Sequence, residues 1–572
     1  MLCPLFIQLF NLQIIRYQLY YRESDRNRIR LVSINAPRGL IYDRNHRIVA
    51  LNTNSYTVSI TPYKIGDRER TLKKICSILE LDTEKIMKIG RVRSSYKPIP
   101  IARNVDYERI AMIEEHKEDL KGIDVERGQI RYYLFNDLAC HIIGYLNEVS
   151  EEEIDKLSEK GYSFGDLIGR SGVESEYENL LRGRDGIKLI EVNAMEREIG
   201  EIYPEKTQFP KPGHNITLSI DMNLQRKAEE LLSPYNAGAL VMLHAKTGQI
   251  LVLANHPRYN LNMLSGTISS ENWNSLINDP YHPMFNRAIS SRYPPGSVYK
   301  VVTAAAAIEV LGFDEFTTQA PCIGYYSLGN RDFKCWNLKG HGSLNLLQAM
   351  AQSCDVYFYQ LGLKLGLENM YQYSLKMNLG QVTGIDLQGE SKGLIPNDEY
   401  YRKKLGNHRF PRGILLNLSI GQGEILVTPI QMAHMMNLIG NNGHGFAPHL
   451  LVSWDDPASS RQYFNHPKPV SLDIQPQTLS LIQKSLLAVV YSGTGGRASV
   501  EGLRVAGKTG SAENPGELTH AWFAGYAPYE APEVAFACVL ENVGHGGSMA
   551  APIVGQLLSY YYDSLKVTHD TY

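Results

Sequence analysis

The rhythm of apolar and polar positions divides the chain into two parts. The first part mixes charged stretches of helical spacing with short β-like runs, the former at 66–90 and 105–120 and the latter at 36–44, 47–51 and 55–60. A cluster of turn-forming residues then marks a break, at Pro204, Pro210, Pro212 and Gly213. The pattern predicts an N-terminal region that ends near residue 215.

The second part alternates long helical segments with strand-like runs. Asp221 begins a predicted helix that extends to about Leu232. Two apolar runs within 239–254, separated by a turn at Gly248, predict a β-hairpin, and 533–540 predicts a further strand. We therefore expect a mixed α/β C-terminal domain.

The first 15 residues are apolar but interrupted by Gln8, Asn11 and Gln13, and Arg16 follows them. A membrane span needs roughly 20 residues, so this stretch is too short on its own. It also lacks the basic start and the small-residue cleavage site of a signal peptide. Three interpretations stay open: the end of a membrane anchor that starts upstream, an interfacial helix, or a hydrophobic helix of a soluble domain.

Composition adds that the chain folds and gives no sign of nucleic-acid binding. Hydrophobic residues make up 43% and charged residues 21%, which is ordinary for a globular protein. The net charge of −2 gives no reason to expect a nucleic-acid partner. The 7 cysteines are too few and too scattered for a disulfide scaffold.

Ser297 and Lys300 form the first candidate catalytic pair. A Pro-Gly pair precedes them, an Ala-rich run follows, and Gly312 ends the run, so both side chains are expected on one face of the first turn of a helix. A neutral amine so close to a hydroxyl can remove its proton, and burial beside another cation favours the neutral amine. The same spacing also occurs by chance, as in Ser94 and Lys97.

Two further elements favour catalysis over chance. Ser353-Cys-Asp355 follows the first pair, and Lys508-Thr-Gly-Ser511 follows near the C-terminus. A second Lys-Thr-Gly, at 246–248, precedes the nucleophile and lies at the expected hairpin turn. Ser-x-x-Lys, Ser-x-Asp/Asn and Lys-Thr-Gly in this order are the signature of the penicillin-binding and serine β-lactamase superfamily.

The whole chain resembles class B, high-molecular-weight penicillin-binding proteins of the elongation type. The residues that carry the resemblance are 36–44, 141–145, 169–177, 286–288, 340–342, 353–359, 421–423 and 428–431. Asp355 favours the elongation type, because relatives of the division type usually have Asn there. The chain departs from the family at His46-Arg47, where relatives usually have Gly, and in its short apolar N-terminus.

The resemblance implies an architecture and a location. It implies a partial membrane anchor over 1–20, a pedestal or dimerisation-type α+β domain over 21–215, and a transpeptidase domain over 216–572 with an antiparallel sheet flanked by helices. It also implies a single-pass protein of the inner membrane with most of the chain in the periplasm. A polytopic glycosyltransferase of the elongation complex is the implied partner.

The implied chemistry is acyl transfer in peptidoglycan synthesis, and β-lactams inhibit it. Ser297 attacks the penultimate D-Ala of a stem peptide, and the side-chain amine of a neighbouring stem then takes the acyl group. Lys300 is the general base, Ser353 relays a proton and is positioned by Asp355, and Lys508 supplies positive field. Thr509 and Ser511 bind the substrate carboxylate, and Gly510 permits its close approach. No cofactor is required.

A cluster of Cys322, Cys335, His341 and Cys354 lies within one short stretch. Four nitrogen and sulfur ligands suit a tetrahedral structural zinc, and the resemblance suggests these four positions. The alternative is a Cys322–Cys335 disulfide with Cys354 simply buried.

Other interpretations stay open at this point. The same acylation residues suit a β-lactam hydrolase or sensor, and the fold alone suits a non-catalytic scaffold. Gly421-Gln-Gly423 is either a tight turn or a part of the site. The aromatic run 356–359 is expected to pack in the core.

Overall fold

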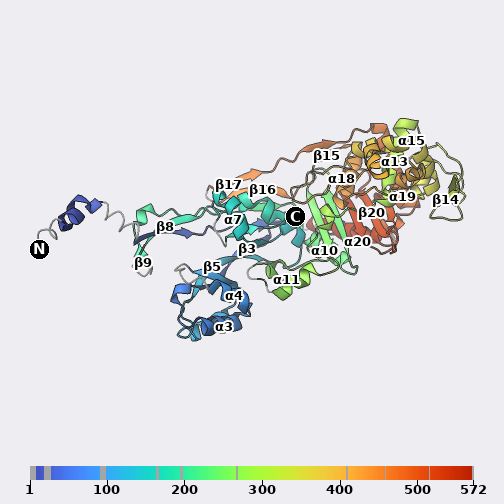
Figure 1. Cartoon of the computed structure of the whole chain (residues 1–572). Helices are drawn as coiled ribbons and strands as arrows, with labels where there is room; N and C mark the ends of the chain where they lie inside the picture. The colour runs from blue at the N-terminus through green and yellow to red at the C-terminus, as the bar shows by residue number, and fades with distance from the viewer. Residues whose placement is uncertain are drawn as a thin grey trace.

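The molecule is elongated, with its N-terminal elements at one end and a large α/β block at the other (Figure 1). The computed structural model describes residues 8–18, 28–90, 98–162, 166–193, 198–265, 268, 270–406, 410–457, 459–514 and 516–569. The C-terminus lies between the two ends, beside the block (Figure 1).

A five-stranded antiparallel sheet forms the centre of the C-terminal block. Its strands, in spatial order, are β12 (Ile250–His256), β11 (Gly238–His244), β21 (Val534–Leu540), β20 (His520–Ala527) and β19 (Ala506–Ala512). The hairpin predicted over 239–254 and the strand predicted over 533–540 are confirmed.

Helices cover both faces of this sheet, which explains why its strands are apolar at nearly every position. In β11, Val241 belongs to the core under α18 (Pro429–Gly440), whereas Leu240 and Met242 belong to the core under α10 (Met222–Leu232) and α20 (Ala550–His569). Asp221 caps α10 by accepting hydrogen bonds from the backbone of Asn223 and Leu224, as the sequence predicts for this helix start.

A helical lobe stands beside the sheet and supplies half of the candidate site. It consists of α13 (Lys300–Leu311), α14 (Leu346–Ala351), α15 (Asp355–Lys376), α16 (Asp398–Leu405), α17 (Gly413–Ser419) and α19 (Pro476–Ser492). The hairpin of β13 (Tyr325–Leu328) and β14 (Arg331–Lys334) extends from it. The aromatic run 356–359 at the start of α15 is buried, which confirms core packing.

Smaller elements connect the lobe and the sheet. They are η5 (Leu261–Met263), α11 (Ser270–Ile277), α12 (Arg287–Ser290), η6 (Gly296–Tyr299), η7 (Gly496–Ala498) and the pair β15 (His444–Phe446) and β18 (Pro469–Ser471).

The N-terminal region is built on a long strand, β3 (Ile48–Ile60), which pairs along its length with β5 (Ile123–Tyr133). The sequence predicted two strands here, but the chain stays extended between them. By contrast, of the run 36–44 only β2 (Ile41–Tyr42) is strand. His46 takes φ 57°, the conformation that a glycine would adopt, and Asp43 Oδ1 accepts from the backbone of Asn45 and Arg47. The departure from the family at His46-Arg47 therefore still forms a tight turn.

A separate helical cluster packs at the far end of β3. The stretch 66–90, predicted as helical, forms two helices, α3 (Arg68–Leu79) and α4 (Thr83–Gly90), because Glu80 takes a left-handed φ of 53°. The stretch 105–120 forms α5 (Tyr107–Glu115), and β4 (Ile99–Val105) precedes it. These elements enclose their own apolar core.

The other N-terminal elements are small sheets and short helices. They are the three-stranded sheet β1 (Ile29–Ile34), β8 (Gly186–Val192) and β9 (Glu198–Glu201), the pair β6 (Leu146–Glu148) and β7 (Leu167–Gly169), and the short helices α6 (Cys140–Ile143), α7 (Glu151–Leu157), α8 (Gly172–Glu176) and α9 (Glu178–Leu181). The predicted linker holds a single turn, η4 (Pro204–Lys206).

One sheet crosses the predicted boundary at residues 215 and 216. Its order is β17 (Arg461–Phe464), β16 (Leu451–Asp456), β10 (Asn215–Leu218), β2, β3 and β4, with β5 also on β3. β10 pairs with β2 in parallel and with β16 in an antiparallel manner. Strands from late in the chain thus complete a sheet that begins near the N-terminus.

The N-terminal apolar stretch is helical over the described part, residues 8–18, and includes η1 (Asn11–Ile15). Leu9, Phe10, Ile14 and Ile15 are exposed on it. Within the described residues, no helix is both long and apolar enough to span a membrane.

Candidate active site

Ser297 lies in the turn η6, which leads directly into α13 at Lys300. Gly296 takes φ 53°, and a Cβ atom at this position would lie 2.7 Å from the carbonyl oxygen of Ser511. Glycine is therefore required for the turn to lie against β19. Ser297 is half-buried and Lys300 is fully buried, so the predicted pair lies on one continuous turn with the serine on its open side.

Both candidate lysines contact the hydroxyl of Ser353. Lys300 Nζ lies 3.2 Å from Ser353 Oγ, and Lys508 Nζ lies 2.9 Å from the same atom. Lys300 also donates to the Ser353 carbonyl oxygen at 2.8 Å. Ser353 lies in the loop between α14 and α15 at φ 52°. The structure thus brings together three predicted residues that are up to 208 positions apart in the sequence.

Asp355 makes contacts that differ from the expected ones. Its Oδ1 atom accepts from Lys300 Nζ at 2.7 Å, and its Oδ2 atom accepts from the backbone N–H of Trp336 at 2.9 Å. The sequence predicted that Asp355 positions Ser353, but the structure pairs it with Lys300. No role was predicted for Trp336 from the sequence. Its indole N–H also donates to the carbonyl oxygens of Gln352 and Ser353, at 3.1 and 3.2 Å.

Burial lowers the pKa of Lys508 well below its usual value, and the charge of Lys300 lowers it further. Asp355 acts in the opposite direction but does not outweigh these effects. A Lys508 amine that readily gives up its proton can take one from Ser353.

Strand β19 carries Lys508, Thr509, Gly510 and Ser511 past the nucleophile turn. A Cβ atom at Gly510 would lie 2.7 Å from the carbonyl oxygen of Pro295, so the absent side chain lets the strand pack against η6. This is a reason for glycine beyond the expected approach of substrate. Thr509 Oγ1 lies 2.6 Å from the hydroxyl of Thr494, a residue that the sequence did not single out.

Gly421-Gln-Gly423 joins the nucleophile turn to β19. Gly296 N–H donates to the Gly421 carbonyl oxygen at 3.0 Å, and Gln422 Nε2 donates to the Ser511 carbonyl oxygen at 3.1 Å. A Cβ atom at Gly421 would lie 2.2 Å from the Gly296 carbonyl oxygen. Of the two open interpretations, the structure favours a part in the site.

Behind the nucleophile turn, Glu541 holds the chain that leads into it. Its Oε1 atom accepts from Arg287 Nε at 2.8 Å and from the Tyr293 hydroxyl at 2.7 Å. The indole N–H of Trp522 donates to the Pro294 carbonyl oxygen at 3.0 Å. These contacts give a structural reason for the 286–288 segment, and the sequence offered no signal for Glu541 because its partners are about 250 residues away.

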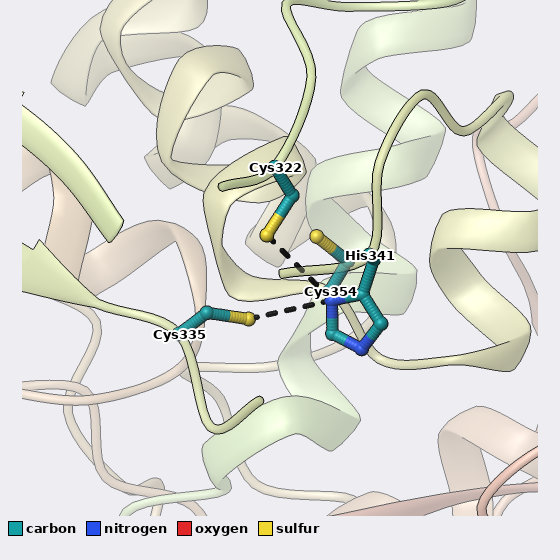
Figure 2. Close-up of side chains that lie close together, drawn as sticks. All are labelled: Cys322, Cys335, His341 and Cys354. Carbon is teal, nitrogen blue, oxygen red and sulfur yellow. Dashed lines mark hydrogen bonds between the residues drawn. The ribbon is translucent and has the colours of Figure 1, made fainter. Parts of the chain in front are cut away.

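Cys322, Cys335, His341 and Cys354 point toward one another, as the sequence predicted (Figure 2). Their ligand atoms all lie within 4.8 Å of one another, and the three cysteines are buried. All three are free thiols, so the alternative of a Cys322–Cys335 disulfide is not found. The Cys354 thiol hydrogen-bonds to Cys335, which lowers the pKa of Cys335 and favours its thiolate.

The geometry of the cluster fits a tetrahedral metal ion. His341 Nδ1 lies 3.6 Å from both Cys322 Sγ and Cys335 Sγ (Figure 2). A nitrogen and a sulfur bound tetrahedrally to zinc at ordinary bond lengths lie about 3.6 Å apart. Cys354 immediately follows Ser353, and Cys335 immediately precedes Trp336, so the cluster adjoins both residues that contact the lysine and aspartate of the site.

Two further motif matches were attributed to chance, the Lys-Thr-Gly at 246–248 and the Ser-x-x-Lys at 94–97. Lys246 lies in the turn of the hairpin between β11 and β12, where its Nζ atom donates to Asn441 Oδ1 at 3.3 Å. Ser94 and Lys97 lie outside the described residues.

Two family models cover most of the chain. Residues 238–559 match the penicillin-binding protein transpeptidase domain, and residues 33–218 match the penicillin-binding protein dimerisation domain. The chain is 31% identical to the peptidoglycan D,D-transpeptidase MrdA of Escherichia coli strain K12, over 98% of this chain and 92% of that protein. It is also 31% identical to the protein of the same name from Acinetobacter baumannii, over 96% of this chain and 84% of that protein.

Solved structures agree with these matches. The fold is similar to penicillin-binding protein 2 of Helicobacter pylori in its complex with MreC, with a TM-score of 0.80 and 28% identity over 93% of this chain and 100% of that chain. It is also similar to penicillin-binding protein 2 of Pseudomonas aeruginosa in complex with WCK 5153, with a TM-score of 0.70 and 27% identity over 93% of this chain and 96% of that chain.

Proposed function

The chain belongs to the family of penicillin-binding protein transpeptidases, and from this premise we propose that it is a peptidoglycan D,D-transpeptidase of the penicillin-binding protein 2 type that cross-links stem peptides during cell elongation. One observation carries the proposal for the site. Lys300, one turn beyond Ser297, and Lys508 both contact Ser353 Oγ, at 3.2 and 2.9 Å. This arrangement provides a nucleophile, a base and a path for protons.

Acylation begins with a proton transfer among the buried groups. Lys300 passes a proton through the Ser353 hydroxyl to the neutral amine of Lys508, which leaves Lys300 neutral. Lys300 then takes the proton of Ser297 as Ser297 Oγ attacks the penultimate D-Ala carbonyl carbon. The peptide C–N bond breaks, the proton returns through Ser353 to the leaving amine, and terminal D-Ala departs. The acyl group stays on Ser297 as an ester.

Transfer repeats these steps with the acceptor. The side-chain amine of a diamino acid in a neighbouring stem attacks the ester carbonyl, and its proton passes to Lys300. Ser297 recovers this proton from Lys300 as the ester bond breaks. Lys508 then passes its own proton back through Ser353 to Lys300, which restores the starting state. The Asp355 carboxylate accepts a hydrogen bond from Lys300 Nζ at 2.7 Å in a buried position, and so holds the Lys300 amine in place.

The substrate lies along β19 in this proposal. Thr509 and Ser511 bind the terminal carboxylate, and Gly510 leaves the strand edge open for the peptide backbone. The backbone N–H groups of Ser297 and Ser511 form the oxyanion hole. This assignment is supported by the close approach of the Gly296 turn to the Ser511 carbonyl group.

The test is to map covalent acylation on the full chain. We expect a fluorescent penicillin to form a stable adduct, which mass spectrometry places on Ser297 and which a Ser297→Ala variant lacks. A donor peptide ending in D-Ala-D-Ala should then release D-Ala, and a supplied amine should replace it. If no adduct forms on Ser297, the catalytic proposal fails and the non-catalytic scaffold replaces it.

The same experiment separates a transpeptidase from a β-lactam hydrolase or sensor. A hydrolase would release the bound penicillin within seconds, whereas a transpeptidase keeps the adduct for many minutes. The close match to named transpeptidases, over a dimerisation domain as well as the catalytic domain, supports the transpeptidase.

We further propose that Cys322, Cys335, His341 and Cys354 hold a structural zinc ion. The fit of the donor atoms to a tetrahedron supports this assignment. By holding the ion, Cys354 would fix the loop before α15 and Cys335 would fix the segment at Trp336, and both would help to keep Asp355 facing Lys300. The catalytic chemistry itself requires no cofactor.

Metal analysis tests this second proposal. We expect about one equivalent of zinc per chain, and a large loss in a Cys335→Ser variant. Cys538→Ser is the matched control, because Cys538 is also buried and lies in β21, away from the cluster. Less than half an equivalent in the wild-type protein would contradict the proposal.

The proposed substrate also indicates where the protein lies in the cell and which partner it has. Stem peptides lie outside the cytoplasmic membrane, so we place the catalytic part in the periplasm and residues 1–20 in a single-pass anchor of the inner membrane. The exposed apolar side chains at 9–15 support contact with lipid. A polytopic glycosyltransferase of the elongation complex is the proposed partner, in line with a related structure titled "Structural coordination of polymerization and crosslinking by a peptidoglycan synthase complex".

A further inference from the structure

The loop that follows β21 reaches the end of β19 and contacts Ser511. His545 Nδ1 lies 3.3 Å from Ser511 Oγ, and the backbone N–H of Gly546 donates to the same oxygen at 3.3 Å. The hydroxyl of Thr519 donates to the Gly544 carbonyl oxygen at 2.7 Å and so fixes the start of the loop. His545 is exposed at the rim of the proposed carboxylate site.

Glycine at position 546 makes this contact close. A Cβ atom there would lie 2.2 Å from the Trp522 carbonyl oxygen and 2.3 Å from the Gly510 carbonyl oxygen. The loop is therefore packed directly on the strand that carries Lys508 and Ser511, and the imidazole is held beside the hydroxyl.

The contacts limit where the Ser511 hydroxyl hydrogen can point. A serine hydroxyl has one hydrogen to donate and two lone pairs that accept. Gly546 N–H takes one lone pair. If His545 Nδ1 carries no hydrogen, it attracts the Ser511 hydrogen. If Nδ1 carries a hydrogen, it donates to the second lone pair, and the Ser511 hydrogen is free for a carboxylate.

We propose that His545 is a positioning residue for the terminal carboxylate of the donor peptide, which it controls through the direction of the Ser511 O–H bond. The inference rests on the proposed function, in which Ser511 binds that carboxylate. Protonation of the imidazole removes the form that competes for the hydroxyl hydrogen and adds a positive charge beside an anion. Binding of a carboxylate donor therefore improves as the imidazole gains its second proton.

Other charged groups surround the loop and enter the test. On and beside the elements packed against it, the charged or titratable side chains are Lys508 on β19, Glu513 just after β19, Glu517 just before β20, His520 on β20, Glu541 just after β21 and Arg497 in η7. Lys508 and Glu541 already contact Ser353 and Arg287. Because these groups are present in every variant below, ratios between variants cancel their titration.

The experiment measures the second-order rate of Ser297 acylation by a fluorescent penicillin, which carries one carboxylate, on the full chain from pH 5.5 to 8.5. The variants are His545→Ala, which removes the imidazole, and His545→Asn, whose amide can donate at every pH. His466→Ala is the matched control, because His466 is also exposed and lies after β17, far along the chain from this loop.

We compare the second-order rate constants of acylation. The wild-type value divided by the His545→Ala value should rise to about ten at the acid end of the pH range and fall toward one at the alkaline end. His545→Asn should exceed His545→Ala by a constant factor at all pH values, and His466→Ala should match the wild type. A merely structural role would lower the rate equally at every pH.

If the ratio of the wild-type to the His545→Ala acylation rate constant is the same at every pH, the inference is overturned. If His545→Ala does not fold, His545→Asn decides the question: loss of the pH-dependent component supports the inference, and a profile that follows the wild type overturns it. Failure of the wild-type protein to acylate at all is a different result, because it overturns the proposed function instead.

Discussion

At the scale of single residues, Ser353 is the point at which the two lysines of the site meet. Its backbone lies at φ 52°, a conformation that side chains with a Cβ atom seldom adopt. The hydrogen bonds from Lys300 and Lys508 hold it there, so strain and function lie on the same residue.

Replacing Ser353 by glycine removes the hydroxyl but suits this backbone conformation. We expect Ser353→Gly to slow acylation by about 10²–10⁴-fold, because the proton path between the lysines is broken. Thermal unfolding should stay near that of the wild type. Ser353→Ala is the companion variant, and we expect a similar rate with lower stability, since alanine is strained at this φ. Acylation within a few-fold of wild type in both variants would exclude a relay at this residue.

His141 gives the molecule a sensitivity to acid. Its Nε2–H donates to the Pro283 carbonyl oxygen at 2.7 Å, and burial lowers the pKa of His141 from 6.5 to about 4. Between about pH 6.5 and 4 the unfolded chain therefore binds a proton that the folded chain does not. The free energy of unfolding falls as the pH drops through this window, by about 3 kcal/mol in total.

His141→Gln tests this effect, because the amide keeps a donor toward Pro283 and does not titrate. We expect its unfolding free energy to fall less than that of the wild type between pH 6.5 and 4, as measured by denaturant unfolding. Parallel curves for the two proteins over this window would show that His141 does not control the acid sensitivity.

The sequence predicted the identity of the site residues better than their contacts. Ser297, Lys300, Ser353 and Lys508 belong to short motifs in a fixed order, and such patterns can be found along a chain. The partners of Asp355 could not, because Trp336 contributes a backbone N–H, which any residue possesses. The contacts of Glu541 and His545 could not be predicted for a related reason, since only the folded sheet brings their partner segments near.

At the scale of elements, the site depends on the close packing of η6 against β19. The contact uses two glycines from different elements, Gly296 in the turn and Gly510 in the strand. Each allows a carbonyl group of the other element to approach. The packing fixes the distance between the nucleophile and the strand that binds substrate.

Gly296→Ala should separate these two elements. The added Cβ atom would lie 2.7 Å from the Ser511 carbonyl oxygen, and alanine is strained at φ 53°. We expect acylation to fall by more than about 100-fold, since displacements near 1 Å have effects of this size, and stability to fall by about 1–3 kcal/mol.

Gly312→Ala is the matched control for this variant. Gly312 ends α13, the helix that follows this turn, and takes φ 70°, but a Cβ atom there has nothing within 4 Å. Gly312→Ala should therefore lower the free energy of unfolding by about 1 kcal/mol, through backbone strain alone, and leave the acylation rate nearly unchanged. Equal effects of the two substitutions on acylation would show that backbone strain, and not packing on β19, controls the rate.

Element boundaries were harder to predict than element types. The stretch 66–90 has helical spacing throughout, yet a left-handed Glu80 divides it into α3 and α4. The runs 47–51 and 55–60 are one strand, because β5 pairs along the whole of β3 and keeps it extended. In the second case the packing partner, which is distant in sequence, decides the boundary, and in the first the local conformation of Glu80 does.

At the scale of the whole molecule, a buried ionic network holds the N-terminal region together. Glu174 accepts from Arg131 Nε at 2.6 Å and from Arg38 Nε at 2.7 Å, and the Glu174 side chain has no exposed surface. Arg38 also contacts Glu178. Two of the three N-terminal segments that resemble the family, 36–44 and 169–177, are therefore joined by these charges.

Glu174→Gln should destabilise this region by about 3–5 kcal/mol, because it leaves the buried Arg131 without a carboxylate partner and leaves Arg38 with Glu178 alone. We expect an earlier unfolding transition in calorimetry, with penicillin acylation at 25 °C nearly intact. Glu69→Gln is the control, since Glu69 forms an exposed i,i+4 pair with Lys73. A loss of acylation equal to the loss of folded protein would show instead that the two regions unfold together.

The sheet that crosses residues 215 and 216 has a mechanical consequence. Because β10, β16 and β17 are hydrogen-bonded into the same sheet as β2, β3 and β4, the joint between the N-terminal region and the catalytic block is a continuous plate and not a swivel. The α3–α5 cluster and the β1–β8–β9 end lie away from the catalytic block (Figure 1), and this shared sheet lies between them and the block. We therefore expect the two parts of the molecule to turn together and not to rotate freely about residues 215 and 216.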